Sequence, residues 1–235
     1  MFVTESSFLS PIQDYHFYRN SCKNDKSCCR RYFGKSDIIL YIKQISLASY
    51  KSSALSNNIM NKSVLITGVA GTGKSAVCDE LNKLGYKAFG IEDINGLFTM
   101  VHKKTGKPFK DYDNDDLEKV KQADWICDKK KLQRLMDKNS NGIVFYNGIA
   151  SNLDDLLPLF DKVFLLEVGE KILRERLSTR TSNDFARTAE VQDHLFSWKK
   201  WWEDHMKEKG AILVDASRSL KEVANDIIAR SKSSN

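Results

Sequence analysis

The chain has 235 residues, 41% of them hydrophobic and only 3 of them proline, which is enough for one or two globular domains with a buried core. The formal net charge is +6, but residues 1–59 hold 8 Lys+Arg against 4 Asp+Glu and carry most of this excess. The rest of the chain is therefore nearly neutral. This argues against a broad nucleic-acid-binding surface and fits a small anionic ligand held by a few local cations.

Cysteine usage and apolar runs bear on the compartment. The five cysteines match no zinc-binding spacing, and an odd number does not suit a disulfide framework. A reducing compartment is the simplest interpretation. The sequence shows no apolar run long enough for a membrane span and no apolar core at its start that resembles a secretory signal. We therefore expect a cytoplasmic protein without membrane contact.

Residues 1–59 are rich in Ser, Asn, Lys and Tyr and show no sustained helical or strand period. Met60 then stands directly before the first strong strand. We expect 1–59 to be an N-terminal extension, either a poorly ordered tail or translated upstream sequence, and 60–235 to form the folded domain. An organelle-targeting segment and a small accessory element are the alternatives. Acidic residues count against targeting, and they are Glu5, Asp14, Asp25 and Asp37.

The strongest motif is VLITGVAGTGKS at 64–75, which joins strand-forming residues to the phosphate-binding loop pattern Gly-x4-Gly-Lys-Ser/Thr. A helix is predicted over 74–84, because apolar residues recur there at i, i+4 and i+7. The strand before the loop and the helix after it are the context that this motif requires.

The residue types of the loop suit a triphosphate. Glycines let the backbone come close and take positive φ, and the helix N-terminus adds unpaired N–H groups and the positive end of its dipole. Lys74 is expected to reach the β- and γ-phosphates, and the Ser75 hydroxyl to ligate Mg²⁺. The predicted nucleotide-binding residues are Gly68, Ala70, Gly71, Thr72, Gly73, Lys74, Ser75 and Ala76.

From residue 62 onward, predicted strands and helices alternate, which indicates a parallel sheet with right-handed crossovers. We expect strands at 63–67, 86–91, 142–146, 162–167 and 211–214. Helices are expected at 74–84, 92–103, 123–138, 169–180, 189–208 and 219–231, with a polar loop at 104–116. The aspartates in that loop predict a turn and a helix cap, because the Gly and Glu that a calcium loop needs are absent.

Two acidic residues, Glu92 and Asp93, follow the second predicted strand. Ligands of open α/β sheets bind at the carboxyl ends of the strands, so a carboxylate there can hold Mg²⁺ or accept the proton of a substrate hydroxyl. The alternative is that the pair only stabilises a helix N-terminus. Asn147 and Asn152, after the third strand, are candidates for substrate contact by position alone.

Three arginines are candidates for contact with the transferred phosphoryl group. Arg176 and Arg180 lie four residues apart on a predicted helix, and Arg187 lies in the polar segment 181–189 that follows. A guanidinium suits this role because it binds phosphate through two hydrogen bonds. The alternative is a solvated helix with an ion pair to Glu175. Because 181–189 has few apolar residues, we expect it to be a lid that closes over both substrates.

The chain from 62 to 231 resembles the nucleoside-monophosphate-kinase-like branch of phosphate-loop proteins, which includes adenylate, shikimate and gluconate kinases and uncharacterised small nucleotide kinases. The resemblance is carried by GVAGTGKS at 68–75, RERLSTR at 174–180 and Arg187. Shorter matches are Glu92-Asp93, Gly96-Leu97 and Thr105-Gly106. The resemblance implies a three-layer α/β phosphate-loop NTPase fold with a five-stranded parallel sheet of order 2-3-1-4-5, helices on both faces and a small lid.

The sequence departs from the family pattern at two strand ends. Relatives often carry Asp-x-Asp after the second strand, but Gly90 stands at the first of these positions. The third strand ends in Asn147, where an aspartate is expected. Neither strand end therefore supplies a standard Mg²⁺-holding acid.

The leading hypothesis is an ATP- and Mg²⁺-dependent kinase, monomeric or homodimeric, that phosphorylates an unidentified nucleotide or other small acceptor. Lys74 would hold the phosphates, Ser75 would hold Mg²⁺, and Glu92 or Asp93 would orient the acceptor or the metal. The residues expected to close over the transferred group are Arg176, Arg180 and Arg187. The alternatives are a nucleotide-binding regulatory module or slow ATPase without a small-molecule acceptor, and nucleic-acid binding through the basic residues 1–59.

Overall fold

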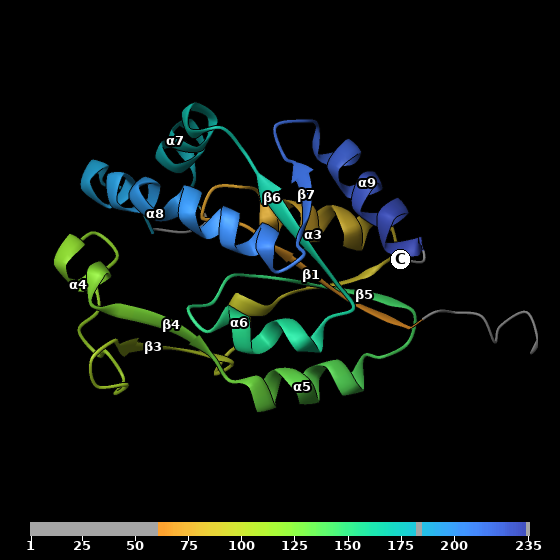
Figure 1. The fold of residues 1–235 in the computed structure, drawn as a ribbon, viewed down its shortest axis with the longest axis horizontal. Helices are drawn as coiled ribbons and strands as arrows, with labels where there is room; N and C mark the ends of the chain where they lie inside the picture. Colours follow the sequence, from red (N-terminus) through yellow and green to blue (C-terminus); the bar gives the residue numbers. More distant parts are fainter. Residues whose placement is uncertain (1–60, 182–184, 234–235) are drawn as a thin grey trace, which may run out of the picture. The chain divides into compact units, whose positions relative to one another are not determined.

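A computed structural model describes residues 61–181 and 185–233, so the predicted N-terminal extension lies outside the described residues. The main feature of the described residues is a five-stranded parallel sheet (Figure 1). Counted along the chain, these five strands have the spatial order 2-3-1-4-5, which confirms the predicted topology. In spatial order they are β2 (Lys87–Gly90), β5 (Ile143–Asn147), β1 (Lys62–Thr67), β6 (Lys162–Glu167) and β7 (Ile212–Asp215).

The three central strands read as continuous apolar runs, as expected for parallel strands covered on both faces. Leu65 of β1, Phe145 of β5 and Phe164 of β6 have no exposed surface. Burial of these runs against the helices is the main stabilising contribution to the domain. Because all five strands are parallel, their carboxyl ends meet at one edge of the sheet, where open α/β folds bind their ligands.

Helices lie on both sides of the sheet, and α3 and α9 pack against each other (Figure 1). Among the helices of the described part, none is long and apolar enough to cross a membrane. The helices are α3 (Lys74–Lys83), α4 (Leu117–Lys121), α5 (Lys129–Lys138), α6 (Leu153–Leu156), α7 (Glu170–Thr179), α8 (Ala189–Glu208) and α9 (Leu220–Lys232), with 3-10 turns η2 (Ile91–Asp93) and η3 (Leu157–Leu159).

Residues 92–103 are not the predicted helix but contain strand β3 (Phe98–His102), which pairs antiparallel with β4 (Ala123–Cys127). The predicted helix 123–138 is correspondingly shortened to α5. The apolar spacing at 92–103 fits a helix face, but its residue types also suit a strand. A cross-strand pair decides the outcome, because Phe98 stacks on Trp125 with ring centroids 5.1 Å apart.

The connection between β3 and β4 is polar, as predicted, and ends in the short helix α4. Asp116 caps this helix, because its Oδ1 accepts hydrogen bonds from the backbone N–H groups of Glu118 and Lys119 at 3.0 and 3.2 Å. The aspartates of this loop therefore include a helix cap, in agreement with the prediction.

The β3–β4 hairpin is attached to the segment that follows β5. Ser151 exchanges two hydrogen bonds with the backbone of Trp125, at 2.8 and 3.0 Å. The Asn152 side chain bonds both the N–H and the carbonyl of Cys127, at 3.0 and 3.1 Å. Asn152 was a candidate for substrate contact, but both ends of its amide are engaged in holding the hairpin. Its role is structural.

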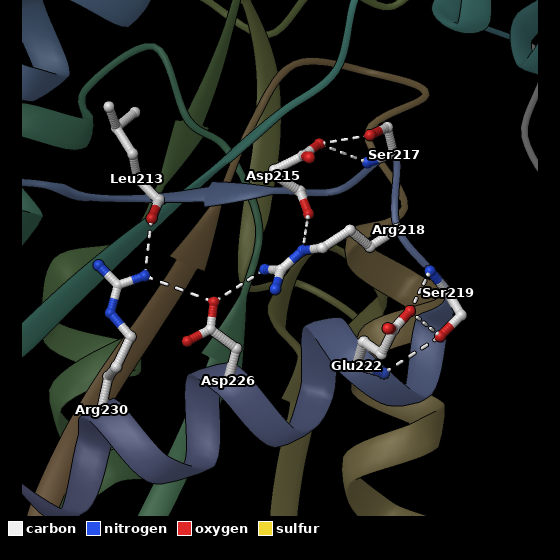
Figure 2. A network of polar contacts seen from close by, with 8 residues as sticks. All are labelled: Leu213, Asp215, Ser217, Arg218, Ser219, Glu222, Asp226 and Arg230. Carbon is white, nitrogen blue, oxygen red and sulfur yellow. Dashed lines mark hydrogen bonds and ion pairs between the residues drawn. The ribbon is translucent and has the colours of Figure 1, made fainter.

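The edge strand β7 has its outward carbonyl groups bound by arginines (Figure 2). Arg230 donates to the carbonyl of Leu213 at 2.8 Å, and Arg218 donates to the carbonyl of Asp215 at 3.0 Å. Asp226 lies between the two guanidinium groups, 2.8 Å from Arg218 and 3.5 Å from Arg230. Positive charge at a sheet edge opposes pairing with another chain, so this network protects the edge.

Candidate active site

The loop from residue 68 to 73 joins β1 to α3 at the carboxyl edge of the sheet. Gly68 has φ +155°, and a Cβ there would lie 2.6 Å from Oγ1 of Thr72 and 2.9 Å from the carbonyl oxygen of Leu166. Only glycine therefore fits at this position. The Thr72 hydroxyl donates to the carbonyl of Val69 at 2.9 Å, which closes the turn and directs this side chain inward.

Helix α3 begins without a side chain bound to its first N–H groups. Its N-cap is Gly73, at φ +98°, and its first turn contains no acidic residue. Ser75 and Ala76, in that turn, are exposed. Uncapped N–H groups and the positive end of the helix dipole favour an anion at this point. The backbone that a phosphate group requires is therefore present.

Lys74 is largely buried, with 12% of its side chain exposed. Its ammonium donates to the carbonyl of Gly68 at 3.0 Å and lies 3.8 Å from Oε1 of Glu92. Burial lowers the pKa of Lys74 against the opposing effect of Glu92, and the charge of Arg180 lowers it further. A bound phosphate would add negative charge beside this ammonium and favour its charged form. The surroundings of Lys74 thus suit an anionic ligand.

Glu92 connects Lys74 of α3 to the segment that follows β5. Its Oε1, which lies near the Lys74 ammonium, also accepts a hydrogen bond from the backbone N–H of Ile149, just after β5, at 3.0 Å. The Glu92 side chain is 29% exposed, so this ion pair contributes more to orientation than to stability. The structure places the Glu92 carboxylate beside the loop lysine, and its role in holding Mg²⁺ or accepting a proton stays a prediction.

Asp93 takes up the space that a side chain at residue 90 would fill. A Cβ on Gly90 would lie 2.6 Å from Oδ2 of Asp93 and 3.4 Å from Oδ1 of Asn147. The carboxylate that the resemblance leads one to expect from residue 90 is thus replaced in space by one from three residues later. This relation depends on the 3-10 turn η2, which the sequence did not predict.

Asn147, at the end of β5, is 4% exposed and bridges to the start of α3. Its Nδ2 donates to the backbone carbonyl of Lys74 at 2.7 Å. Because that carbonyl can only accept, the bond fixes which end of the amide faces α3. Asn147 therefore positions the first turn of the helix that carries Lys74 and Ser75.

Arg176 of α7 reaches the loop from the side of β6 and β7. Its Nη1 donates to the carbonyl of Thr72 at 3.4 Å, and its Nη2 donates to the carbonyl of Ala216, just after β7, at 3.1 Å. The structure thus brings Arg176 to the loop, in preference to an ion pair with Glu175.

Arg174 joins α7 to α8 at the surface. Its guanidinium binds Glu170 and Asp193, each at 2.8 Å, and lies 4.4 Å from the ring centroid of Phe196.

Arg180 does not share a helix face with Arg176, because α7 ends at Thr179 and Arg180 has extended backbone angles of φ −70° and ψ 146°. Its guanidinium donates to the carbonyl of Phe185. Its charge nevertheless acts on Lys74, whose pKa it lowers. Arg187 is exposed, two residues before the start of α8.

The segment predicted as a lid has apolar anchors that its sequence did not reveal. Residues 182–184 lie outside the described residues. Of the rest, Phe185 packs against the core, and Ala186 is fully buried with φ +61°. The Ala186 carbonyl accepts a hydrogen bond from Nε2 of Gln192 at 3.1 Å. The expectation that 181–189 has few apolar side chains packed against the domain was therefore wrong for residues 185–186.

The donor atoms near Lys74 fit a magnesium ion that arrives with a triphosphate. In the described part of the chain, no group of three or more His, Cys, Asp and Glu side chains is arranged to hold a metal by itself. Mg²⁺ usually binds through one or two carboxylates together with substrate phosphates and waters. The exposed Ser75 hydroxyl and the carboxylates of Glu92 and Asp93 are the side chains suited to this.

A cavity of about 180 Å³ lies elsewhere, at the amino ends of β1 and β5. It is lined by residues from 61–63, from the end of α5 and its following turn, and from β5. These strand ends are opposite to the carboxyl edge that carries the phosphate-binding loop. The cavity therefore does not belong to this site.

Comparison with known proteins gives one family and one curated relative. The family described as AAA domain (AAA_18) matches residues 64–197. An adenylate kinase isoenzyme 6 homolog of Plasmodium falciparum (isolate 3D7) is 28% identical over 124 residues. This alignment covers 50% of the present chain and 64% of the relative.

Several solved kinases are similar at low identity. A deoxyadenosine kinase from M. mycoides with bound dATP is 17% identical, with a TM-score of 0.45 and coverage of 73% of this chain and 100% of that one. A shikimate kinase from Acinetobacter baumannii in complex with shikimate is 13% identical, with a TM-score of 0.48 and coverage of 73% and 93%. A gluconokinase from Sinorhizobium meliloti 1021 is 23% identical, with a TM-score of 0.43 and coverage of 73% and 91%.

Proposed function

Because the chain belongs to the AAA_18 (AAA domain) family, whose match includes the phosphate-binding loop, we propose that it is an ATP-dependent small-molecule kinase of the nucleoside-monophosphate-kinase type. The observation that carries this proposal is the placement of Lys74. Its buried ammonium lies between the loop carbonyl of Gly68 and the carboxylate of Glu92, beside the uncapped N-terminus of α3. The curated relative is named as an adenylate kinase homolog, which supports phosphoryl transfer as the reaction type.

The donor triphosphate binds in this proposal to the backbone N–H groups of the loop and to Lys74. The Ser75 hydroxyl holds Mg²⁺, which neutralises charge on the phosphates during transfer. Arg176 already contacts the loop, and Arg180 lies close enough to affect Lys74. Arg187 completes the set of arginines that act on the transferred group. Phosphoryl transfer needs little covalent work by the protein, so positioning and charge account for most of the catalysis.

A nucleotide-binding regulatory module or slow ATPase is the second candidate. The observation that favours it is at the strand ends, where Gly90 and Asn147 stand in place of the acids that the resemblance implies. Asn147 is moreover occupied with the carbonyl of Lys74. One observation counts against the regulatory module. The carboxylate of Asp93 lies beside Gly90 and supplies a negative charge at the end of β2.

The experiment that separates these functions measures ADP release from Mg·ATP with and without added acceptors, over a panel of ribonucleoside monophosphates, ribonucleosides and small hydroxy acids. A kinase releases ADP rapidly only when one acceptor is present, and releases no matching amount of inorganic phosphate. Hydrolysis at the same rate without any acceptor, or ATP binding without turnover, would contradict the kinase proposal and favour the regulatory module.

A further inference from the structure

The cavity at the amino ends of β1 and β5 is built around one buried tyrosine. Its volume is about 180 Å³, and Tyr146 of β5 lines it although only 1% of that residue is exposed. The Tyr146 ring packs against Phe89 and Phe160, with ring centroids 5.7 and 5.8 Å away. Close packing on both rings fixes the direction of this side chain, so the phenol group stays at the cavity.

The Tyr146 hydroxyl has no hydrogen-bond partner among residues 61–181 and 185–233. A buried tyrosine hydroxyl usually has a partner, and a buried donor without one costs stability. The hydroxyl is not sealed off from solvent, as the unpaired hydroxyl of Thr67 is, so it opens onto the cavity that Tyr146 lines. Burial and the charge of Asp137 raise the pKa of Tyr146 to about 12, so the hydroxyl keeps its proton at neutral pH. The cavity thus contains a fixed donor that needs an acceptor.

The charged groups that line the cavity leave a negative charge available to a ligand. The ammonium of Lys62 donates to the carbonyls of Ser231 and Ser233, both at 2.9 Å, so its charge is committed to the end of α9. Asp137 is exposed near the end of α5, and its Oδ1 accepts a hydrogen bond from Gln133 at 2.9 Å. Its Oδ2 has no partner in the described part of the chain. A ligand is therefore expected to bring a donor to this carboxylate.

Water alone does not suit the inner part of this cavity. About six water molecules would fill the volume at roughly 30 Å³ each, and each needs two or more polar partners. The buried lining residues are Met136, Val144 and Tyr146, whose side chains offer one hydroxyl and are otherwise apolar. Apolar walls with a few placed polar groups are typical of small-molecule sites. The volume is below that of a drug-sized site, so it limits the ligand to one or two rings.

We infer that this cavity binds a small amino-substituted nitrogen heterocycle, such as a free nucleobase. A ring nitrogen or carbonyl oxygen of the ligand accepts from Tyr146, and its amino group donates to Asp137. The flat ring lies against the apolar side chains, where the Met136 sulfur adds a favourable contact with an aromatic ring. The phosphate-binding loop lies at the opposite ends of these strands, so the inference does not depend on the proposed kinase function.

Saturation-transfer NMR titrations of the full chain test this site, with cytosine and adenine as probes. Uracil and hypoxanthine are the matched controls, because each carries a carbonyl in place of the amino group and turns an acceptor toward Asp137. Mg·ADP is kept in excess so that the phosphate-binding loop is occupied. We expect cytosine and adenine to bind, and their carbonyl analogues to bind at least about tenfold more weakly, since a hydrogen bond to a charged group is lost.

The substitution Tyr146→Phe removes only the hydroxyl. We expect the Kd for cytosine to rise about fivefold or more, as for one lost hydrogen bond, while the melting temperature without ligand does not fall, because the hydroxyl is unpaired. Tyr86→Phe is the control, since Tyr86 does not line the cavity, and it should keep the Kd of the wild type. Asp137→Asn should narrow the preference for cytosine over uracil, because an amide can donate to a carbonyl.

Binding of cytosine that weakens in Tyr146→Phe and not in Tyr86→Phe supports the inference. The same Kd in the wild type, Tyr146→Phe and Asp137→Asn would place the base at another site and overturn it. Uracil that binds as tightly as cytosine to the wild type would contradict the part assigned to Asp137. If none of the four bases binds, the cavity holds water only and the inference is wrong.

Discussion

Lys74 makes the clearest residue-scale prediction, because its ammonium is directed at the loop and not at the apolar core. In Lys74→Ala we expect kcat for phosphoryl transfer to fall about a hundredfold or more, as for loss of one charged donor to a transition state. The measurement is ADP release beside a thermal melt. Lys83→Ala on the same helix is the control, since that side chain is 72% exposed. Near-normal turnover in Lys74→Ala would refute the site assignment.

Arg187 is the second residue whose role can be measured. We expect Arg187→Ala to lower kcat about a hundredfold while changing the Kd for ATP far less, because we propose that Arg187 contacts the transferred group chiefly in the reacting state. Arg134→Ala, which removes an exposed arginine from α5, serves as the control and should leave both constants unchanged. If Arg187→Ala weakens ATP binding as much as it lowers kcat, Arg187 binds the ground state and has no special part in transfer.

The positions of single residues could be predicted from the sequence where a motif fixes the backbone. They could not be predicted where side chains from separate segments come into contact only in the folded chain. Lys74 and Ser75 follow from the loop pattern alone. The placement of Asp93 over Gly90 required a 3-10 turn that no period reveals. Asn152 was proposed by its position, yet its amide is used within the fold because the β3–β4 hairpin passes beside it.

At the scale of elements, an ion pair between α6 and α8 predicts a pH effect on stability. Asp154 lies 3.0 Å from Nε2 of His205, and this hydrogen bond lowers the pKa of Asp154. Because the folded pKa is lower than the unfolded one, the stability from Asp154 is present above the unfolded value of about 3.9 and is lost as pH falls through the folded pKa.

The measurement is urea unfolding of the wild type and Asp154→Asn at several pH values. We expect a difference in the free energy of unfolding at pH 6 of less than about 1 kcal/mol, because the pair is partly exposed, and a smaller difference at pH 2.5. Asp155→Asn, at the neighbouring exposed aspartate, is the control. An equal difference at both pH values would show that the contact between α6 and α8 does not depend on the charge of Asp154.

Helices and strands were predicted well where one period dominates and poorly in the hairpin. The central strands are apolar throughout, and α8 has one clear apolar face, so both were visible in the sequence. In 92–103 the same apolar residues fit a helix face and a strand, and only the partner strand β4 decides between them. Long-range pairing of this kind leaves no periodic signal in the segment itself.

At the scale of the whole molecule, the sheet order 2-3-1-4-5 and the family resemblance are confirmed. The strand order was implied by the family resemblance, which the loop motif and the arginine segment 174–180 carry. The alternation of strands and helices by itself predicted only a parallel sheet with right-handed crossovers. The acceptor could not be predicted in this way, since it depends on side chains from separate segments that meet at one edge of the sheet.

The N-terminal extension leads to a prediction for the whole chain. The composition changes at Met60, directly before β1, so a chain that begins there should keep the melting temperature and ATP affinity of the full chain. Thermal melts with and without Mg·ATP compare the two. A melting temperature lowered by many degrees would show that residues 1–59 stabilise the domain.

We propose that the loop around Lys74 serves phosphoryl transfer to a small molecule. The most direct measurement follows the label of γ-³²P-ATP when the full chain is incubated with Mg²⁺ and a protein-free extract of small metabolites. We predict that the wild type transfers the label to an organic phosphate ester and that Lys74→Ala does not. Label that appears only as inorganic phosphate, or an ester formed equally fast by Lys74→Ala, would contradict the claim.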